Sequence, residues 1–447
     1  MMEHEISGIE VSPMPNIYRL AIPFLLVACI SVAQADQNVL PIAAKAVAKK
    51  TATPVTSSTP EAASSPAAAT TAIPPAEITP APVPATASLA APVIAALKEQ
   101  EIIKFGGFGS LGFAHSSQNS GDYVLDSSVP KGVGRSSNFW PGNNSRAAAH
   151  ISGNFTPQLS GIFQVDTEYR TDGTYRPEIE WLNVKYAFTP NTFMRVGRIA
   201  LQTFIDSENH DVGYSYVWVN PPVDLYHQLS IAGSDGLDFG YRSEIGQAGN
   251  TIKAIYGSNV SERPTSKTTS KDMWGIFDTF EYGPTTLHFS YQQRRTQTKN
   301  LLTGSTGEWT QNSDISIGGS YDPGNWFVIS EWMQRRSTTK ISAMYVSGGC
   351  RIDKFTPYVL YSQNSPGSFY ASATPPSASA VERAKRSQRT TTLGLRWDFM
   401  RNYDFKLQLD QVKLSDDSNG YLINVPKNVN LHGHTFYVVT TVVDFVF

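Results

Sequence analysis

The sequence has few charged residues, only two cysteines and no long apolar run. Charged residues make up 17% of the 447 positions, whereas soluble globular proteins average about 25%. The 36 basic and 38 acidic residues nearly cancel, which argues against the strongly basic character of a nucleic-acid binder. Two cysteines exclude a disulfide-dense secreted scaffold. No apolar run reaches the ~18–20 residues of a transmembrane helix, since the longest, residues 20–33, contains Pro23.

Aromatic residues are plentiful, at 11% of the chain. This chain is rich in aromatics, poor in charge and without a membrane-spanning helix. A transmembrane β-barrel is the remaining structure by which such a chain could span a bilayer. The remaining sequence patterns favour this fold.

Residues 1–35 have the pattern of a secretory signal peptide. Arg19 precedes an apolar stretch at residues 20–32, and Ala33-Gln34-Ala35 provides a small-x-small cleavage site. A lipoprotein signal is the alternative, because the residues before Cys29 resemble a lipobox. Both interpretations predict export.

Residues 36–100 are rich in alanine, proline, threonine and serine. Such a composition cannot bury enough apolar surface to fold alone, so we expect a disordered, semi-rigid periplasmic spacer. A short helical pattern over residues 95–103 ends it, either as a frayed helix or as a small trimerising coil. Residues 101–447 are then the transmembrane β-barrel domain.

Apolar and polar residues alternate with period two from residue 103 onward. For example, Leu393, Leu395 and Trp397 alternate with Gly394 and Arg396. Segments of about ten residues that alternate in this way are typical of barrel strands with one face toward lipid and the other toward the lumen.

Turn spacing predicts sixteen strands in an all-β, antiparallel, up-and-down barrel. We expect the strands at residues 103–113, 146–156, 159–170, 177–188, 193–199, 236–244, 249–257, 273–282, 285–296, 308–321, 325–337, 341–350, 354–363, 389–400, 404–414 and 434–447. Tight turns follow the even-numbered strands. Most odd-numbered strands precede longer loops, at residues 114–145, 200–235, 258–272, 364–388 and 415–433. Outer-membrane barrels have short periplasmic turns and long external loops, so both ends of the barrel are expected on the periplasmic side.

Aromatic residues gather beside the predicted tight turns, as expected for a girdle at the level of the lipid headgroups. They are Phe155, Tyr186, Phe188, Phe193, Tyr282, Tyr321, Trp326, Phe355, Phe399, Tyr403 and Phe405.

The last predicted strand is apolar in alternation and ends on the terminal residue, Phe447. In this it resembles the final strand of Gram-negative outer-membrane β-barrels, which the barrel-assembly machinery recognises. By this resemblance Tyr437, Val443, Phe445 and Phe447 form the assembly signal.

Residues 103–447 resemble the sixteen-stranded diffusion porins of the outer membrane over their whole length. Sixteen strands leave an aqueous lumen. The resemblance implies passive diffusion of ions and small hydrophilic solutes, a homotrimer, contact with outer-membrane lipid, and a third external loop that folds into the lumen. The long N-terminal extension is similar to that of DcaP-like porins, and the length is similar to that of the phosphate-selective O/P type.

The third predicted external loop is residues 200–235. Its Trp-Val-Asn-Pro-Pro segment (218–222) suits a loop packed on an inner wall. We expect its polar residues to narrow the pore: Asp206, Glu208, His210, Asp211, Asp224 and Asp235. Alternation places a mixed set of charges on the lumen wall: Asp166, Glu168, Lys185, Arg195, Arg294, Glu331, Arg335, Arg396 and Asp398. Acids on the loop that face bases on the wall would create a transverse field, in which charge and diameter set selectivity. The alternative is a structural role, in which these charges pair with one another and keep the lumen hydrated.

No catalytic or cofactor motif fits the pattern. Residues 107–112 match G-x-G-x-x-G, but inside a strand and without a following helix, so no nucleotide is expected. No metal-ligand spacing occurs, and we expect neither metal nor cofactor. An outer-membrane barrel enzyme, such as a phospholipase or protease, is the alternative function, with His150 and His288 as lumen candidates. An adhesin that acts through loops 114–145 and 364–388 is another.

Overall fold

The computed structural model describes residues 103–228, 232–369, 381 and 384–447. These residues all belong to one compact unit, residues 96–447. The expected signal peptide and spacer, residues 1–100, lie outside the described residues. No helix within the described part of the chain is both long enough and apolar enough to cross a membrane.

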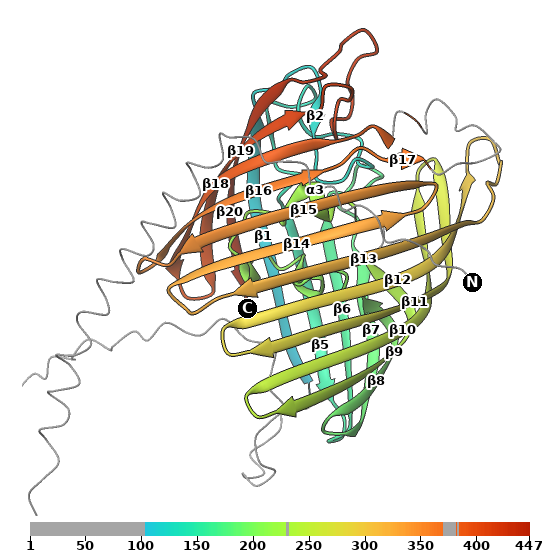
Figure 1. Ribbon diagram of the computed structural model, residues 1–447, viewed down its shortest axis with the longest axis vertical. Helices are drawn as coiled ribbons and strands as arrows, with labels where there is room; N and C mark the ends of the chain where they lie inside the picture. The colour runs from blue at the N-terminus through green and yellow to red at the C-terminus, as the bar shows by residue number, and fades with distance from the viewer. Residues whose placement is uncertain (1–102, 229–231, 370–380, 382–383) are drawn as a thin grey trace, which may run out of the picture. The chain divides into compact units, whose positions relative to one another are not determined.

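One antiparallel sheet of eighteen strands closes on itself to form the barrel wall (Figure 1). Two of these strands, β4 (Phe139–Trp140) and β17 (Ser368–Phe369), have two residues each and only extend the wall at loop bases. The other sixteen are β1 (Ile103–Ser116), β5 (Arg146–Asn154), β6 (Leu159–Glu168), β7 (Glu178–Thr189), β8 (Thr192–Ala200), β9 (Gly233–Ile245), β10 (Ala248–Arg263), β11 (Ser266–Tyr282), β12 (Thr285–Asn300), β13 (Thr310–Tyr321), β14 (Trp326–Arg336), β15 (Thr339–Cys350), β16 (Phe355–Asn364), β18 (Gln388–Met400), β19 (Tyr403–Leu414) and β20 (Thr435–Val446). The predicted sixteen-stranded barrel is therefore confirmed.

The first and last wall strands close the barrel. β1 pairs with β20 from Phe108 opposite Val446 to Ser116 opposite Val438, and its other edge pairs with β5. Among the strands that the structure describes, none of the barrel wall is left with an open edge to pair with another chain. Glycines make this seam close-fitting, because a Cβ atom on Gly107 would lie 2.5 Å from the Phe447 ring.

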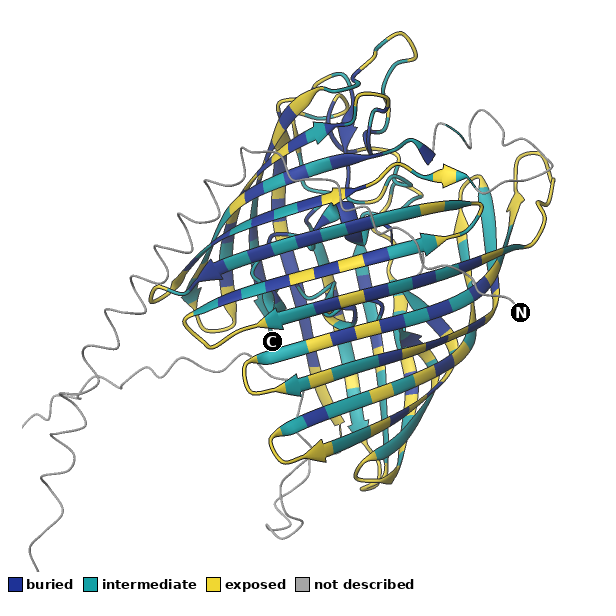
Figure 2. Ribbon diagram, viewed as in Figure 1, coloured by how far each residue is buried: buried dark blue, intermediate teal, exposed yellow. Residues whose placement is uncertain are grey.

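The two faces of the wall differ in polarity. Along β19, Leu407 and Leu409 are 43% and 39% exposed, whereas Lys406 and Gln408, which alternate with them, are buried. The same alternation of exposed and buried residues runs along the other strands (Figure 2). Apolar side chains outside and polar side chains inside are the arrangement of a barrel surrounded by lipid.

One predicted loop is wrong. Residues 258–272 were expected to form an external loop, but β10 and β11 continue through them and leave only residues 264–265 as the turn. Register shifts after Gly257 and after Lys271 interrupt the alternation, and the residues beyond them are polar on both faces apart from Val260. The sequence pattern therefore stops where the strands rise above the apolar band.

The first long loop carries a small hairpin of its own. β2 (Asp122–Tyr123) pairs with β3 (Val133–Gly134), and Asp122 also bridges to Ile423 in the loop before β20. Two loops that are far apart in sequence thus meet at the same end of the barrel.

Candidate functional site

The loop between β8 and β9 lies inside the barrel. Its described residues, 201–228 and 232, contain the short helices η1 (Ser207–Asn209), η2 (Gly213–Ser215) and α3 (Val223–Tyr226). The backbone N–H of Ile205 donates to Glu331 on β14 at 2.9 Å, and the Trp218 indole donates to Ser347 on β15 at 2.8 Å. Both partners point inward, so the loop crosses the lumen.

Aromatic packing attaches the loop to one side of the wall. Phe204, Trp218 and Leu225 of the loop are almost fully buried against inward-facing residues of β14, β15 and β16. The Trp218 and Tyr345 rings meet edge to face, with centroids 5.6 Å apart. Burying side chains of this size stabilises the docked loop by roughly 1.5–3 kcal/mol each, which explains the apolar Trp-Val-Asn-Pro-Pro segment.

Two inward-facing cations hold the middle of the loop. Lys406 of β19 donates to the Gly213 carbonyl at 2.6 Å and pairs with Asp444 of β20 at 2.9 Å. Arg396 of β18 donates to the carbonyls of Tyr214 and Tyr216, each at 2.9 Å.

The backbone of the loop approaches the barrel seam at Gly213. A Cβ atom there would lie 2.6 Å from the Asp444 carboxyl carbon and 2.7 Å from the Ser110 hydroxyl of β1. Only glycine fits at this position without moving the seam residues.

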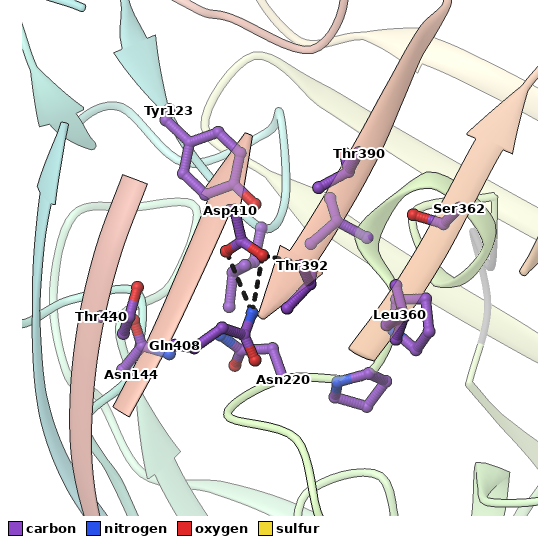
Figure 3. A pocket seen from close by; sticks show the side chains of 14 residues that line it. Tyr123, Asn144, Asn220, Leu360, Ser362, Thr390, Thr392, Gln408, Asp410 and Thr440 are labelled. Carbon is purple, nitrogen blue, oxygen red and sulfur yellow. Dashed lines mark hydrogen bonds between the residues drawn. The ribbon is translucent and has the colours of Figure 1, made fainter. Parts of the chain in front are cut away.

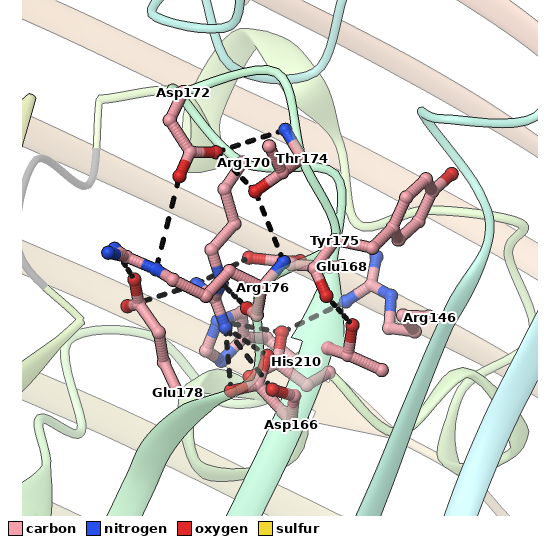
Figure 4. Close-up of polar contacts among 12 residues, drawn as sticks. Arg146, Asp166, Glu168, Arg170, Asp172, Thr174, Tyr175, Arg176, Glu178 and His210 are labelled. Atoms are coloured by element: carbon pink, nitrogen blue, oxygen red, sulfur yellow. Dashed lines mark hydrogen bonds and ion pairs between the residues drawn. The ribbon is translucent and has the colours of Figure 1, made fainter. Parts of the chain in front are cut away.

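The lumen remains open beside the loop, whose residues Asn220, Val223 and His227 form part of the cavity lining. A cavity of about 1570 Å³ lies at the long-loop end. Its lining includes seven arginines and seven acidic residues: Arg146, Arg170, Arg176, Arg198, Arg263, Arg335, Arg386, Asp126, Glu168, Asp172, Glu178, Glu180, Asp211 and Glu262. Many of these charges are joined in pairs on the β6–β7 side, where Arg170 binds Asp166 and Arg176 binds Glu178 (Figure 4).

The acids on the loop contact bases on the wall directly. Glu208 lies 3.3 Å from both Arg195 of β8 and Lys253 of β10. Asp211 pairs with Arg146 of β5 at 2.9 Å. These contacts span the lumen from loop to wall, so the charges meet rather than face each other across an open gap.

The environment of the loop shifts the pKa values of its titratable groups. Burial raises the pKa of Asp206 to about 6. Burial also acts to raise the pKa of Glu208, but Lys253 and Arg195 outweigh it, so the pKa lies below its usual value. For His210, burial is the largest single effect and acts to lower the pKa, but the Asp211 carboxylate, the Ser207 carbonyl and Glu180 together raise the pKa above its usual value. Glu208 is therefore a permanent anion near neutral pH, whereas Asp206 titrates.

Two of the six predicted loop residues, His210 and Asp211, line the large cavity. Asp206, Glu208, His210 and Asp211 lie within or beside η1. Asp224 is fully buried in α3, where it accepts from Ser362 and Gln388 at 2.8 Å each. A polar cavity of about 20 Å³, lined by Gln408, Asp410 and Thr392, lies beside this segment (Figure 3).

The placement of Asp235 corrects the expected loop boundary. β9 begins at Gly233, so Asp235 is a strand residue. It shares the face of the exposed Leu237 and Phe239 and pairs with Arg198 at 2.7 Å. Asp235 therefore lies on the outer face and not in the loop.

The nine predicted wall residues all take inward positions. They are Asp166, Glu168, Lys185, Arg195, Arg294, Glu331, Arg335, Arg396 and Asp398, on β6, β7, β8, β12, β14 and β18. Arg294 and Arg335 share Asp314, at 2.5 and 2.7 Å. Lys185 lies 4.3 Å above the Phe193 ring and makes no ion pair within the described residues.

Sequence reasoning missed several wall residues that contact the loop. Arg146 and Lys253 were absent from the predicted set although both bind its acids. Lys406, Asp404 and Asp444 were missed as the group that holds Gly213. Alternation alone places Lys406 inward with Gln408 and Asp410, but the sequence carries no signal for the loop atom it contacts.

The two histidines proposed for an enzyme lie against neighbouring wall residues, and a Cβ atom on Gly106 of β1 would lie 2.7 Å from Nε2 of His150. His288 lies 2.9 Å from the Gln202 carbonyl and 3.1 Å from the Thr279 hydroxyl. Across the described ranges, no group of three or more His, Cys, Asp or Glu side chains is arranged to hold a metal ion.

No family model matches the chain, and no curated protein matches it. Its fold is similar to that of several solved outer-membrane structures. The anion-selective porin from Comamonas acidovorans has 12% identity and a TM-score of 0.49, over 77% of this chain and 99% of that chain. The outer membrane channel DcaP of Acinetobacter baumannii has 10% identity and a TM-score of 0.49, over 77% and 97%. OmpT, an outer membrane protein of Vibrio cholerae, has 14% identity and a TM-score of 0.47, over 78% and 99%.

Proposed function

We propose that this protein is an outer-membrane channel through which ions and small hydrophilic solutes diffuse passively. The observation that carries the proposal is the cavity of about 1570 Å³ inside the wall, lined by charged side chains. A barrel filled by a packed apolar core could not hold so many charged side chains, because each would lose its hydration. A wet lumen supplies the water that hydrates them.

The orientation follows from the loops. The long loops before β5, β9, β18 and β20 share the end of the barrel opposite the tight turns, and external loops are the long ones in outer-membrane barrels. Together with the expected signal peptide, this supports an outer-membrane location with the large cavity facing outward.

The loop inside the barrel supports a selectivity role for its acids. Glu208 neutralises two bases at once, Arg195 and Lys253, while Lys185 of β7 has no acidic partner within the described residues. We propose that Glu208 and Asp211, together with the wall bases they contact, set the charge of the section where the loop narrows the lumen.

The final strand supports recognition by the barrel-assembly machinery. Tyr437, Val443 and Phe445 share the outward face of β20, and Phe447 comes directly after the strand. The rings of Phe445 and Phe447 lie over Gly109 and Gly107 of β1. Assembly into a homotrimer is proposed from the likeness to the trimeric diffusion porins.

Electrical recording tests the channel proposal. Purified protein added to a planar lipid bilayer should produce stepwise ionic currents. Absence of currents from folded protein would reject the channel and favour the enzyme or adhesin alternatives, which hydrolysis assays and cell-binding assays would then separate.

A further inference from the structure

Two neighbouring wall strands, β7 and β8, separate near the long-loop end. The last pair of their ladder is Leu182 opposite Arg198. Beyond it, residues 178–181 of β7 are held by β6 alone, and residues 199–200 of β8 are held by β9 alone. Four residues span about 13 Å along a strand. Over that length no ladder pair joins β7 to β8, and we call the space between these two segments the gap.

Two backbone irregularities separate the strands. Gly197 lies beside the last ladder pair at φ +130°, and a Cβ atom there would lie 2.1 Å from the Leu182 carbonyl oxygen, so other residues are excluded. On β7, Ile179 and Trp181 pair with successive residues of β6, which makes Glu180 the extra residue of a β-bulge. Bulges bend a strand and increase its twist. The divergence of β7 from β8 is therefore built into the local sequence.

The large cavity extends into the gap. Ile179 and Arg198 both line it, although their side chains belong to the outer face of the wall, which Arg198 shares with the exposed Val196. A cavity confined to the lumen would be lined by inward side chains alone. Arg198 lies across the base of the gap, where it donates to the Ile179 carbonyl at 2.8 Å and pairs with Asp235 of β9 at 2.7 Å. The cavity is therefore open to the outer face above Arg198.

The gap begins directly above the apolar part of the outer face. Leu182 on β7, Val196 on β8 and Leu237 on β9 are 52%, 51% and 42% exposed. Arg198 and Asp235 are the next outward residues on β8 and β9. Because the apolar band of a membrane barrel ends near the lipid headgroups, the gap lies at the headgroup level and not within the hydrocarbon.

The gap has an excess of negative charge. Two ion pairs border it, Arg176–Glu178 and Arg198–Asp235, and their charges cancel. Glu180 lines the cavity and belongs to no ion pair within the described residues. Neighbouring carboxylates repel its charge, and a cation bound beside it would offset that repulsion. The gap therefore favours a positively charged guest.

We infer that the gap is a side entrance to the cavity for single-chain amphiphiles with a cationic head group. The inference rests on the proposed function, through its membrane orientation and its wet lumen. An alkyl chain partitions into the leaflet beside Leu182 and Leu237, which places its head group at the level of the gap. Glu180 receives the head group inside the cavity, whereas ions without a chain enter through the mouth between the long loops.

Photolabelling tests the side entrance. The full-length protein is reconstituted into phosphatidylcholine vesicles with a dodecylammonium probe that carries a diazirine beside the ammonium group, and labelled peptides are identified by mass spectrometry after irradiation. We expect label on residues 176–180. Excess dodecyltrimethylammonium should remove this label. Dodecanoate should not, because its head group is an anion, and tetramethylammonium should not, because it has no chain. Equal displacement by any of the three would overturn the inference.

A bulky side chain beside the gap should close the entrance. Gly233 of β9 lines the cavity opposite Ala200, the last residue of β8, and a Cβ atom on it would meet no atom closer than 3.4 Å. Gly233→Phe should therefore fold and lose the label on residues 176–180. Val184→Phe is the matched control, because Val184 lies on the same outer face below the gap, and it should keep the label.

Label on residues 176–180 that is equal in both variants, or absent from the unmodified protein, would overturn the inference. Bilayer currents recorded from the same preparations report on the channel separately. Currents without this label reject the side entrance alone, and the label without currents rejects the channel alone.

Discussion

Replacing Lys406 by methionine should release the loop from the barrel wall. The ammonium group is fully buried, with Asp444 at 2.9 Å, Asp404 at 3.9 Å and the Gly213 carbonyl at 2.6 Å. Removing one partner of a buried ion pair costs about 3–5 kcal/mol, because the other charges stay buried without compensation. Since those charges lie at the loop contact, the docked state should lose roughly a hundredfold to a few thousandfold in population.

Chymotrypsin digestion of the folded protein in detergent measures this release. Tyr214 and Tyr216 lie close to Gly213, the residue whose carbonyl Lys406 binds. Both should become cleavable in Lys406→Met, with the fragments identified by mass spectrometry. Lys413→Met is the matched control, because Lys413 lies on the same strand, outside the lumen and without an ion pair within the described residues. A loop that stays as resistant in Lys406→Met as in the control would refute the assigned role of Lys406.

Three further perturbations follow from the same geometry. Gly213→Ala should also expose the loop to chymotrypsin, because overpacking against Asp444 destabilises the docked loop by about 1–3 kcal/mol. Gly307→Ala is the control and should not expose the loop, since its Cβ would make only an ordinary contact at 3.5 Å. Equal protection of the loop in both variants would contradict the close fit at Gly213. Glu208→Gln leaves Arg195 and Lys253 without their shared carboxylate. The zero-current potential measured in a salt gradient should therefore shift toward anion selectivity. An unchanged potential would show that Glu208 does not lie on the conducting path. Burial raises the pKa of Asp206 to about 6, above that of the unfolded chain, so loop docking should weaken as pH rises through 6. Asp206→Asn should abolish this dependence, and an unaltered pH profile of chymotrypsin cleavage would show that another group titrates.

The barrel could be predicted from the sequence because lipid and water impose opposite requirements on alternate residues. Along β19 each apolar residue from Phe405 to Leu409 faces out and each polar neighbour faces in, and this alternation can be read from the local sequence. The tight turns were equally local, as at Gly283-Pro284 between β11 and β12.

The alternation of apolar and polar residues is lost where the strands no longer have lipid on one face and water on the other. Beyond the apolar band, residues 258–272 meet water on both faces, so the strands there carry no alternation to detect. Asp235 was misplaced because β9 begins three residues earlier than its alternation suggested.

The contacts of the loop were beyond sequence reasoning for a different reason. Trp218 and its neighbouring prolines indicate packing, but which wall strand receives them depends on how the closed barrel orders its strands in space. Lys406 of β19, Asp444 of β20 and Ser110 of β1 meet at Gly213 only because the first and last strands pair at the seam.

The accessibility of one lumen position tests the central claim most directly. Lys185 of β7 is inward and half-buried, and its neighbour Val184 is 49% exposed on the outer face. A charged, water-soluble thiol reagent added during single-channel recording should reduce the current through Lys185→Cys and leave Val184→Cys unchanged. The same reagent acting on neither variant, or equally on both, would contradict a water-filled lumen bounded by a lipid-facing wall.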